Sequence, residues 1–319
     1  MSAVLVTRRL PSAVISKLEA AAAVDLYPGE ASIPPAELCA RLAGKDALIC
    51  LLTDAIDKRV IDAGQNLKIV ANIAVGYNNI DVAYSRSRGV VVTNTPDVLT
   101  ESVANFTWAM VLAVTRRLSE GERLVRRGQW KGWALDFMLG SELRGKQLGL
   151  VGAGRIARAV AVRAAAFEMR VVFTSRRETG PPNTEAPWEN VSLDRLLNTS
   201  DIVSLHVPLT PETRHLIDKR ALARMKRSAY LVNTARGPVV DEAALAWALQ
   251  EHLIAGAALD VYENEPAIHP DLLQMENVLL APHLGSATIE TRRRMAVLAA
   301  ENLVAILAGK PCPNIVNRS

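Results

Sequence analysis

Residues 148–177 read LGLVGAGRIARAVAVRAAAFEMRVVFTSRR, and this stretch decides the fold of the chain. The apolar run 148–151 leads into Gly152-Ala153-Gly154-Arg155-Ile156-Ala157, a helical pattern follows to about residue 168, and a second apolar run covers 170–174. A strand, a tight turn, a helix and a second strand in this order form the unit that binds a dinucleotide pyrophosphate. We expect Gly152 to allow the turn and Gly154 to let the backbone approach the phosphates at the helix N-terminus.

The end of the second strand indicates which dinucleotide is preferred. A site for NAD places Asp or Glu there, about twenty residues beyond the glycines, to hold the ribose 2′-hydroxyl. Ser175 stands near that position instead, and Arg176 and Arg177 follow it. A carboxylate would repel a 2′-phosphate, whereas a guanidinium pairs with phosphate through two hydrogen bonds. The sequence therefore predicts NADP(H) as cofactor, and a weaker use of NAD(H) stays open.

The composition predicts a globular protein of two domains. The chain has 319 residues, half of them hydrophobic, and a net charge of +4. Its basic residues are scattered, which disfavours nucleic acid as a partner and suits small anionic ligands. Cys39, Cys50 and Cys312 are too far apart for a disulfide frame or a metal site. With no signal peptide and no membrane-spanning run, we expect a cytoplasmic protein that holds no metal.

Apolar runs alternate with helical patterns along the chain, which predicts α/β units with parallel sheets. The first hundred residues form one such unit, and a second unit carries the glycine motif. Between the two, the wide apolar stripe of residues 101–127 predicts one long helix that bridges two layers or a subunit interface.

Three polar residues follow three predicted strands of the second unit. Arg236 comes after the strand at 229–233, Glu265 after 256–260, and His283 after 278–281. Ligands of open α/β sheets bind beyond the carboxyl ends of the strands. Arg236 would hold a carboxylate and polarise a carbonyl, and His283 would carry a proton near neutral pH. Glu265 beside it would favour the imidazolium, which is the acid form that a reduction needs.

With these residues in place, the sequence resembles the D-isomer-specific 2-hydroxyacid dehydrogenases. Within that family it is most similar to the NADPH-dependent glyoxylate/hydroxypyruvate reductases, because of Ser175-Arg176-Arg177. The resemblance covers nearly the whole chain. Its motifs are the glycine motif, VGYNNID at 75–81, Asn94-Thr95-Pro96, HVPLT at 206–210 with Thr213, NTARG at 233–237, LDV at 259–261 with Glu265-Pro266, and APHLGSA at 281–287.

The resemblance implies a reductase that transfers hydride from NADPH to a small 2-keto acid. It implies that Arg236 binds substrate, that His283 is the acid/base and that Glu265 is its carboxylate partner. Backbone N–H groups at Val75 and Gly76 would cup the substrate carboxylate. The other implied substrate residues are Leu52 and Trp133, and the implied cofactor residues are Gly152, Gly154, Arg155, Ile156, Ser175, Arg176, Arg177, Val207, Pro208, Thr213, Thr234, Ala235, Asp260 and Gly285.

The resemblance also implies the architecture. Two Rossmann- or flavodoxin-like doubly wound parallel-sheet domains are expected, with a cleft between them. Residues 1–99 and 284–319 would form a discontinuous substrate domain, and residues 100–283 the dinucleotide-binding domain. The helix at 101–127 is similar to the dimer helix of the family, so we expect a homodimer in which Trp133 points towards the substrate site of the neighbouring subunit.

Alternatives stay open at this point. The same fold and mechanism would serve an aryl or alkyl pyruvate, or NADH, and Leu51, Leu52 and Trp133 would set that choice. A more distant alternative is a nucleotide-sensing binding protein that acts as a corepressor. Glu265 disfavours formate dehydrogenases, which carry glutamine there, and a chain ending at Ser319 disfavours phosphoglycerate dehydrogenases with a regulatory domain.

Overall fold

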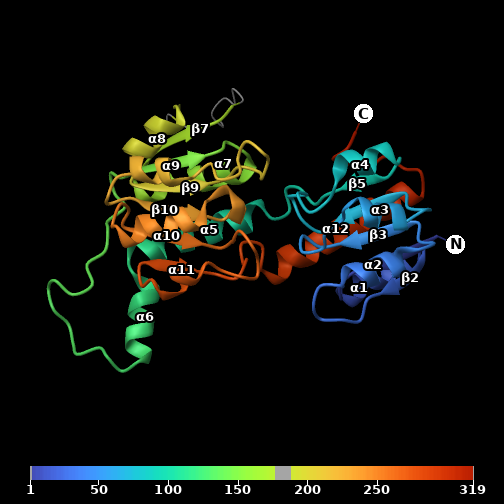
Figure 1. Ribbon diagram of the computed structural model, residues 1–319, viewed down its shortest axis with the longest axis horizontal. Helices are drawn as coiled ribbons and strands as arrows, with labels where there is room; N and C mark the ends of the chain where they lie inside the picture. The colour runs from blue at the N-terminus through green and yellow to red at the C-terminus, as the bar shows by residue number, and fades with distance from the viewer. Residues whose placement is uncertain (1, 177–187, 319) are drawn as a thin grey trace. The chain divides into compact units, whose positions relative to one another are not determined.

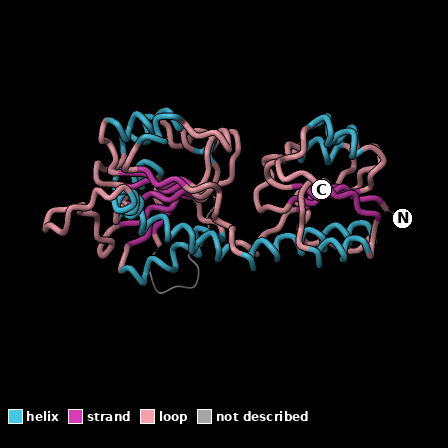
Figure 2. Tube along the Cα trace, turned by 90° about the horizontal axis from the view of Figure 1, so that it is seen from below, coloured by secondary structure: helices cyan, strands magenta, loops and turns pink. Residues whose placement is uncertain are grey.

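The computed structural model describes residues 2–176 and 188–318. The chain divides into two compact units: unit 1 comprises Met1–Leu99 and Thr288–Ser319, and unit 2 comprises Thr100–Ala287. The second division thus falls after Ala287, whereas the sequence places it after residue 283. Each unit is a parallel sheet covered by helices on both faces, which confirms the predicted fold class (Figures 1 and 2).

Unit 1 contains a five-stranded sheet in the order β2-β1-β3-β4-β5, and its described strand pairs are parallel. The order reverses between β1 and β3, as in flavodoxin-like folds. Its elements are β1 (Ala3–Val6), α1 (Ser12–Glu19), β2 (Ala23–Leu26), α2 (Pro35–Leu42), β3 (Ala47–Cys50), α3 (Lys58–Ala63), β4 (Ile69–Asn72), α4 (Val82–Ser87), β5 (Val91–Thr93) and, from the other end of the chain, α12 (Ile289–Leu307).

Both faces of this sheet are buried, because its strands are nearly continuous apolar runs. Leu5, Leu48 and Val70 face a core that α2 and α3 complete, while α1 and α12 pack together and α12 contacts β3 and β4.

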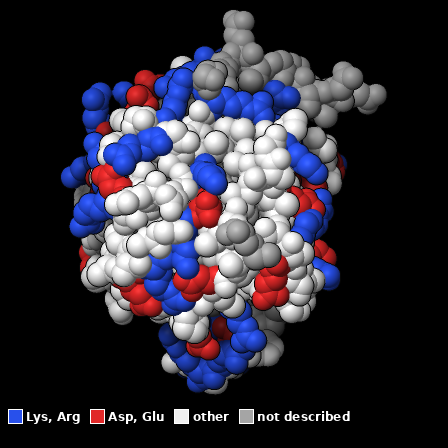
Figure 3. Space-filling view, turned by 90° about the vertical axis from the view of Figure 1, so that its right-hand side faces the viewer, with Lys and Arg blue, Asp and Glu red and all other residues white. Residues whose placement is uncertain are grey.

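Lys/Arg and Asp/Glu side chains are interspersed over the face drawn in Figure 3. Ion pairs such as Lys68–Asp46 (2.9 Å) and Arg88–Asp62 (3.2 Å) reduce the net field of unit 1.

Unit 2 contains a seven-stranded sheet in the order β12-β11-β10-β9-β6-β7-β8. The order reverses between β6 and β9, which is the arrangement of a Rossmann fold. Its elements are α5 (Thr100–Thr115), α6 (Leu118–Arg126), β6 (Gln147–Val151), α7 (Arg155–Ala164), β7 (Arg170–Thr174), β8 (Glu189–Asn190), α8 (Leu193–Thr199), β9 (Ile202–Leu205), α9 (Lys219–Arg224), β10 (Tyr230–Asn233), α10 (Glu242–Gln250), β11 (Gly256–Leu259), α11 (Pro270–Gln274) and β12 (Val278–Leu280), with 3₁₀ turns at Ala165–Phe167 and Gly237–Val239.

The sheet of unit 2 separates two apolar cores. Successive residues of a strand point to opposite faces, so Leu231 packs in one core and Val232 in the other. Helices α8, α9 and α10 close the first core, and α5 and α7 close the second. All four residues of β9, β10 and β11 are buried, which leaves their carboxyl ends as rigid points of attachment for the loops that follow.

The prediction of a single helix at 101–127 is wrong. Helix α5 ends at Thr115, Arg117 takes a left-handed backbone conformation (φ 53°), and α6 begins at Leu118. The carbonyl of Thr115 accepts a hydrogen bond from Ser141 N (2.8 Å), so it is not available to continue the helix. Gly140 makes this approach feasible, since a Cβ there would lie 2.4 Å from the same carbonyl oxygen.

Helix α6 stands out from the body of unit 2, and an extended segment follows it (Figure 1). We call residues 118–140 the arm. None of the helices in the described part of the chain combines the length and the apolar character that a membrane crossing requires.

Candidate active site

The glycine motif lies at the point where the strand order of unit 2 reverses. Gly152 follows β6 with φ 107°, a conformation that side chains rarely adopt, and a Cβ there would lie 2.7 Å from the carbonyl oxygen of His206. Gly152 N also donates to Thr174 O (2.9 Å) at the end of β7. Only glycine therefore allows the turn after β6 to pass between the ends of its two neighbouring strands.

The start of α7 fits an anionic group. Gly154 is the N-cap of this helix and, as a glycine, contributes no side-chain acceptor to its first N–H groups. A Cβ at Gly154 would meet nothing within 4 Å, which leaves open space in front of the turn. Arg155 begins the helix, and Ile156 packs against the core beside Ala157, which is buried. These features suit a dinucleotide pyrophosphate at the positive end of the helix.

The corner that would meet the ribose lies after β7. Ser175 is half-buried and Arg176 is exposed, whereas Arg177 lies outside the described residues. A hydrogen bond from Thr210 and, less strongly, the positive charge of Arg176 lower the pKa of Glu212. Arg176 therefore lies near the loop that follows β9, where Val207, Pro208 and Thr213 are found.

That loop is shaped by Thr213. Its buried hydroxyl donates to Pro208 O (2.6 Å) and accepts from Thr210 N (2.8 Å), so the turn at 208–213 is held from within. After β10, Asn233 holds the next loop in a similar way, because its Oδ1 accepts from Ala235 N (3.0 Å) and its Nδ2 donates to Arg236 O (3.0 Å). Thr234 Oγ1 lies 3.0 Å from the hydroxyl of Thr107 on α5.

The structure brings Glu265 and His283 together beyond β11 and β12. Glu265 Oε2 accepts from His283 Nδ1 (2.9 Å) and its Oε1 accepts from Tyr262 N (3.1 Å). Burial alone would raise the pKa of Glu265, but the hydrogen bonds from His283 and Tyr262 and the charges of His283 and Arg236 leave it below its usual value. The carboxylate is thus ionised at neutral pH and fixes the imidazole through one nitrogen, while the other, Nε2, is not engaged by Glu265.

Arg236 lies near the same pair. Burial lowers the pKa of its guanidinium, and the negative charge of Glu265 opposes that shift. The group stays protonated, because an arginine side chain does not lose its proton in proteins. Its Nη1 donates to Ala235 O (2.6 Å). A fixed cation, an ionised carboxylate and an imidazole therefore occupy the carboxyl edge of the sheet, which is the edge where β9, β10, β11 and β12 end.

The loop that carries His283 is held by Asp260, which is almost fully buried. Each oxygen of Asp260 accepts one backbone hydrogen bond, from Leu284 N (2.6 Å) and from Gly285 N (2.8 Å), and its carbonyl accepts from His283 N (2.9 Å). Burial raises the pKa of Asp260 despite these bonds. They keep His283 in a left-handed conformation (φ 55°) that costs free energy in a non-glycine residue, so its position is set by the fold.

The predicted substrate residues Leu52, Val75 and Gly76 lie in unit 1, beyond the carboxyl ends of β3 and β4, and all three are half-buried. Two buried asparagines hold the loop with Val75 and Gly76. Asn94 Nδ2 donates to Val75 O (2.8 Å) and Asn72 Nδ2 donates to Gly76 O (2.9 Å). With the carbonyls so engaged, the backbone at these two positions is ordered, as an anion-binding loop requires.

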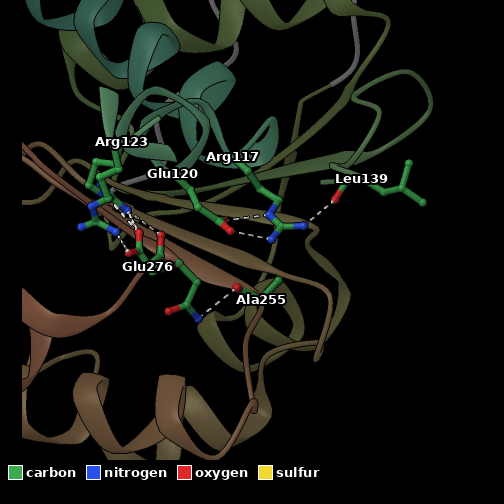
Figure 4. Close-up of polar contacts among 8 residues, drawn as sticks. Arg117, Glu120, Arg123, Leu139, Ala255 and Glu276 are labelled. Carbon is green, nitrogen blue, oxygen red and sulfur yellow. Dashed lines mark hydrogen bonds and ion pairs between the residues drawn. The ribbon is translucent and has the colours of Figure 1, made fainter. Parts of the chain in front are cut away.

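The opposite, amino edge of the sheet in unit 2 has different contents. A cavity of about 420 Å³ lies there, and its lining includes Tyr230, His252 and Asn277. Figure 4 shows the ion pairs of α6: Arg117 and Glu120 pair within its first turn (2.8 Å), and Arg123 Nε donates to Glu276 (2.8 Å) just before β12, which attaches the helix there. This cavity is separated from Arg236, Glu265 and His283 by the length of the strands. The predicted residue Trp133 belongs to the arm and is 81% exposed.

Sequence reasoning missed several residues that position the candidate site. Among them are His215, Glu242 and Glu263, which are bonded to one another although they lie up to 48 positions apart. Asn72 was missed as well, and Asn94 was named only within the motif at 94–96, without a role. A weak signal existed for Asn72, Asn94 and Asn233, because a polar amide at the end of a buried strand needs partners.

A Rossmann-type unit with this set of side chains defines a dinucleotide-dependent dehydrogenase. The model of the family described as D-isomer specific 2-hydroxyacid dehydrogenase, NAD binding domain, matches residues 108–285. The chain belongs to this family, and the resemblance noted from the sequence is confirmed.

Known relatives narrow the comparison. The chain is 49% identical to a glyoxylate reductase of Thermofilum pendens, over 99% of this chain and 94% of that protein. It is 50% identical to a glyoxylate reductase of Korarchaeum cryptofilum, over 99% and 96%. Among solved structures, it is similar to an NADPH-dependent glyoxylate/hydroxypyruvate reductase of Sinorhizobium meliloti in complex with NADP and malonate, with a TM-score of 0.88, 34% identity and coverage of 99% and 96%.

Proposed function

We propose that the protein reduces small 2-keto acids, glyoxylate and hydroxypyruvate above all, to 2-hydroxy acids with NADPH. The observation that carries this proposal is the hydrogen bond of 2.9 Å between Glu265 and His283 at the carboxyl edge of a dinucleotide-binding unit, with Arg236 beside it. The names of the relatives point to the same substrates.

Each of the three side chains has a distinct role. The dinucleotide, when bound, supplies the hydride for the carbonyl carbon. His283 donates the proton that the carbonyl oxygen takes up, and Glu265 stabilises the charged imidazole before that transfer. Arg236 binds the substrate carboxylate and polarises the carbonyl, and its positive charge opposes the negative charge that develops on the oxygen.

Residues of unit 1 would complete substrate binding. The N–H groups at Val75 and Gly76 are proposed to bind the substrate carboxylate, and Asn72 and Asn94 support this role because they fix the carbonyls of the same two residues. Leu52 and Trp133 are proposed to limit the size of the group on the keto carbon. A small pocket would favour glyoxylate and hydroxypyruvate over aryl pyruvates.

NADPH is proposed as the preferred dinucleotide because of the corner after β7. Ser175 brings no negative charge, and Arg176 is exposed and available to a 2′-phosphate. The complex of the Sinorhizobium meliloti enzyme with NADP supports the same preference. Asp260, Thr234, Ala235 and Gly285 are proposed to lie near the nicotinamide, and Val207, Pro208 and Thr213 beside the rest of the cofactor.

We further propose that the protein is a homodimer that forms through the arm. A group of large, exposed apolar side chains on one segment is typical of a protein–protein interface. Six such residues of the arm have more than half of their surface exposed: Leu118, Val125, Trp130, Trp133, Leu135 and Leu139. A second copy of the chain would cover these side chains, and Trp133 of the first copy would then point towards the substrate site of the second copy.

Steady-state turnover tests the proposed function. Glyoxylate, hydroxypyruvate, phenylpyruvate and a longer alkyl 2-keto acid are each offered with NADPH and with NADH, and oxidation of the dinucleotide is followed by absorbance. We expect the highest kcat/KM for glyoxylate or hydroxypyruvate with NADPH. A higher value for phenylpyruvate would assign the other substrate class, and no turnover with any acid would contradict the proposal.

A further inference from the structure

We propose that His215 and Glu263 form a positioning pair that holds the cofactor-lining loop after β9 against the segment that carries Glu265. The proposal rests on the proposed function and deepens it, because it names residues outside the reacting set on which the geometry of that set depends.

The contact is short and partly shielded from water. His215 Nε2 lies 2.5 Å from Glu263 Oε1, and the two side chains are 38% and 17% exposed. His215 lies two positions after Thr213 in the first loop, and Glu263 lies two positions before Glu265 in the second. The pair therefore joins two loops that leave different strands, each close to a residue assigned to the site.

Glu263 is held on its other side by Glu242 at the start of α10. Glu263 Oε2 accepts from Glu242 N (3.2 Å), and Glu263 N donates to Glu242 Oε1 (2.7 Å). The second oxygen of Glu242 accepts from His269 N (3.2 Å). Two neighbouring carboxylates with little access to water require nearby donors, and His215 is the ionisable donor that the geometry supplies to Glu263.

The same cluster encloses the backbone next to Arg236. A Cβ at Gly237 would lie 1.8 Å from the carbonyl carbon of Tyr262, so these two segments are in direct contact. His215 N donates to Pro238 O (2.8 Å) from the opposite side. The loops after β9, β10 and β11 thus meet around the hydrogen bond between His215 and Glu263, and neither residue belongs to the proposed reacting set of Arg236, Glu265 and His283.

Loss of the pair should increase the motion of the two loops relative to each other, whereas the reaction requires them in a fixed arrangement. Small displacements of a reacting group lower the rate while binding persists. For His215→Leu we therefore expect kcat with glyoxylate to fall about 10-fold. We also expect KM and Kd for NADPH to rise severalfold, and KM for glyoxylate to stay the same.

Two further variants make the experiment specific. His215→Gln places an amide nitrogen near the position of Nε2 and should restore kcat and the NADPH affinity. His252→Leu is the matched control, because His252 has the same left-handed backbone (φ 54°, against 50° at His215) but lies at the amino edge of unit 2. We expect this control to behave as the wild type.

Turnover, NADPH binding by fluorescence and the midpoint of thermal unfolding are measured for all four proteins. Equal kinetics of His215→Leu and the wild type would overturn the proposal. So would a loss that raises both KM values, lowers the unfolding midpoint and is not restored by His215→Gln, because that pattern indicates a structural role alone. If the wild type turns over no 2-keto acid, the proposed function fails. The positioning role of His215 and Glu263 is then tested by NADPH binding alone, which must weaken in His215→Leu and recover in His215→Gln.

Discussion

The two edges of the seven-stranded sheet in unit 2 are built from similar residues in different arrangements. Each edge has a histidine with a left-handed backbone, and each has a glutamate bonded to a basic side chain, which is His283 at the carboxyl edge and Arg123 at the amino edge. At the carboxyl edge these groups are at least half shielded and are held by buried backbone and carboxylate contacts. At the amino edge the Arg123–Glu276 pair lies at the surface beside a cavity of about 420 Å³. The difference supports the carboxyl edge as the active site that we propose, because buried polar groups that fix one another favour a functional site more than volume and charge alone.

The comparison of the two edges predicts the largest change in kcat for a variant of His283. His283→Ala should lower kcat by about 10²–10⁴-fold, because the proton donor is lost, while the Kd for NADPH stays nearly the same. Stopped-flow turnover and fluorescence titration measure the two quantities. Near-normal turnover would remove the acid/base role of His283.

Glu265→Gln should have the next largest effect. Loss of the charge that stabilises the protonated imidazole should lower kcat by about 10²-fold and move the alkaline limb of the pH–rate profile to lower pH. Because the folded protein lowers the pKa of Glu265, the carboxylate also contributes stability above its ordinary pKa. That contribution is lost as the pH falls through the lowered value, so the wild type should lose stability below about pH 4.5 and the variant should lose less. An unchanged alkaline limb would contradict the pairing.

Arg176→Ala tests the cofactor corner. Removal of a charge-assisted contact with the 2′-phosphate should raise the KM for NADPH about 10-fold or more and leave the KM for NADH unchanged. Steady-state kinetics with both dinucleotides measure this difference. An equal change for both would show that Arg176 does not distinguish them.

A variant in the arm tests the proposed dimer interface. Leu135 is 82% exposed in the single chain, and Leu135→Asp should raise the dissociation constant of the dimer about 10-fold if a second copy covers it. Sedimentation over a range of concentrations measures the change. Val162, which is also exposed but lies on α7, is the control, and Val162→Asp should leave the association unaltered.

The smallest effect is expected at Glu276. Its pKa is lowered by the hydrogen bond from Arg123 and by the charges of Arg123 and Arg127, but about half of the side chain is in water. Glu276→Gln should therefore change the free energy of unfolding by less than about 1 kcal/mol and should not change kcat. A loss of turnover as large as that of Glu265→Gln would abolish the distinction between the two edges.

Much of this arrangement could be predicted from the sequence because parallel strands bring distant residues to one edge. The glycine motif located the reversal of strand order, and Arg236, Glu265 and His283 each follow an apolar strand. The end of α5 could not be predicted, since the apolar pattern continues past Thr115 and the competing donor, Ser141 N, arrives from another part of the chain. Strand β8 is only two exposed, polar residues long and carries no pattern. The His215–Glu263 pair is equally hidden, because contacts between loops leave no periodic trace.

Helix α12 has a consequence for the order in which the parts of the protein fold. It is synthesised after residues 100–287, yet it packs against β3 and β4, which are synthesised before them. Residues 100–287 are complete before α12 leaves the ribosome, so the dinucleotide-binding unit can fold first. At that time one face of the sheet formed by the N-terminal residues is still uncovered. A nonsense mutation or a protease cut near residue 288 would therefore damage the beginning of the chain more than the part directly before the break.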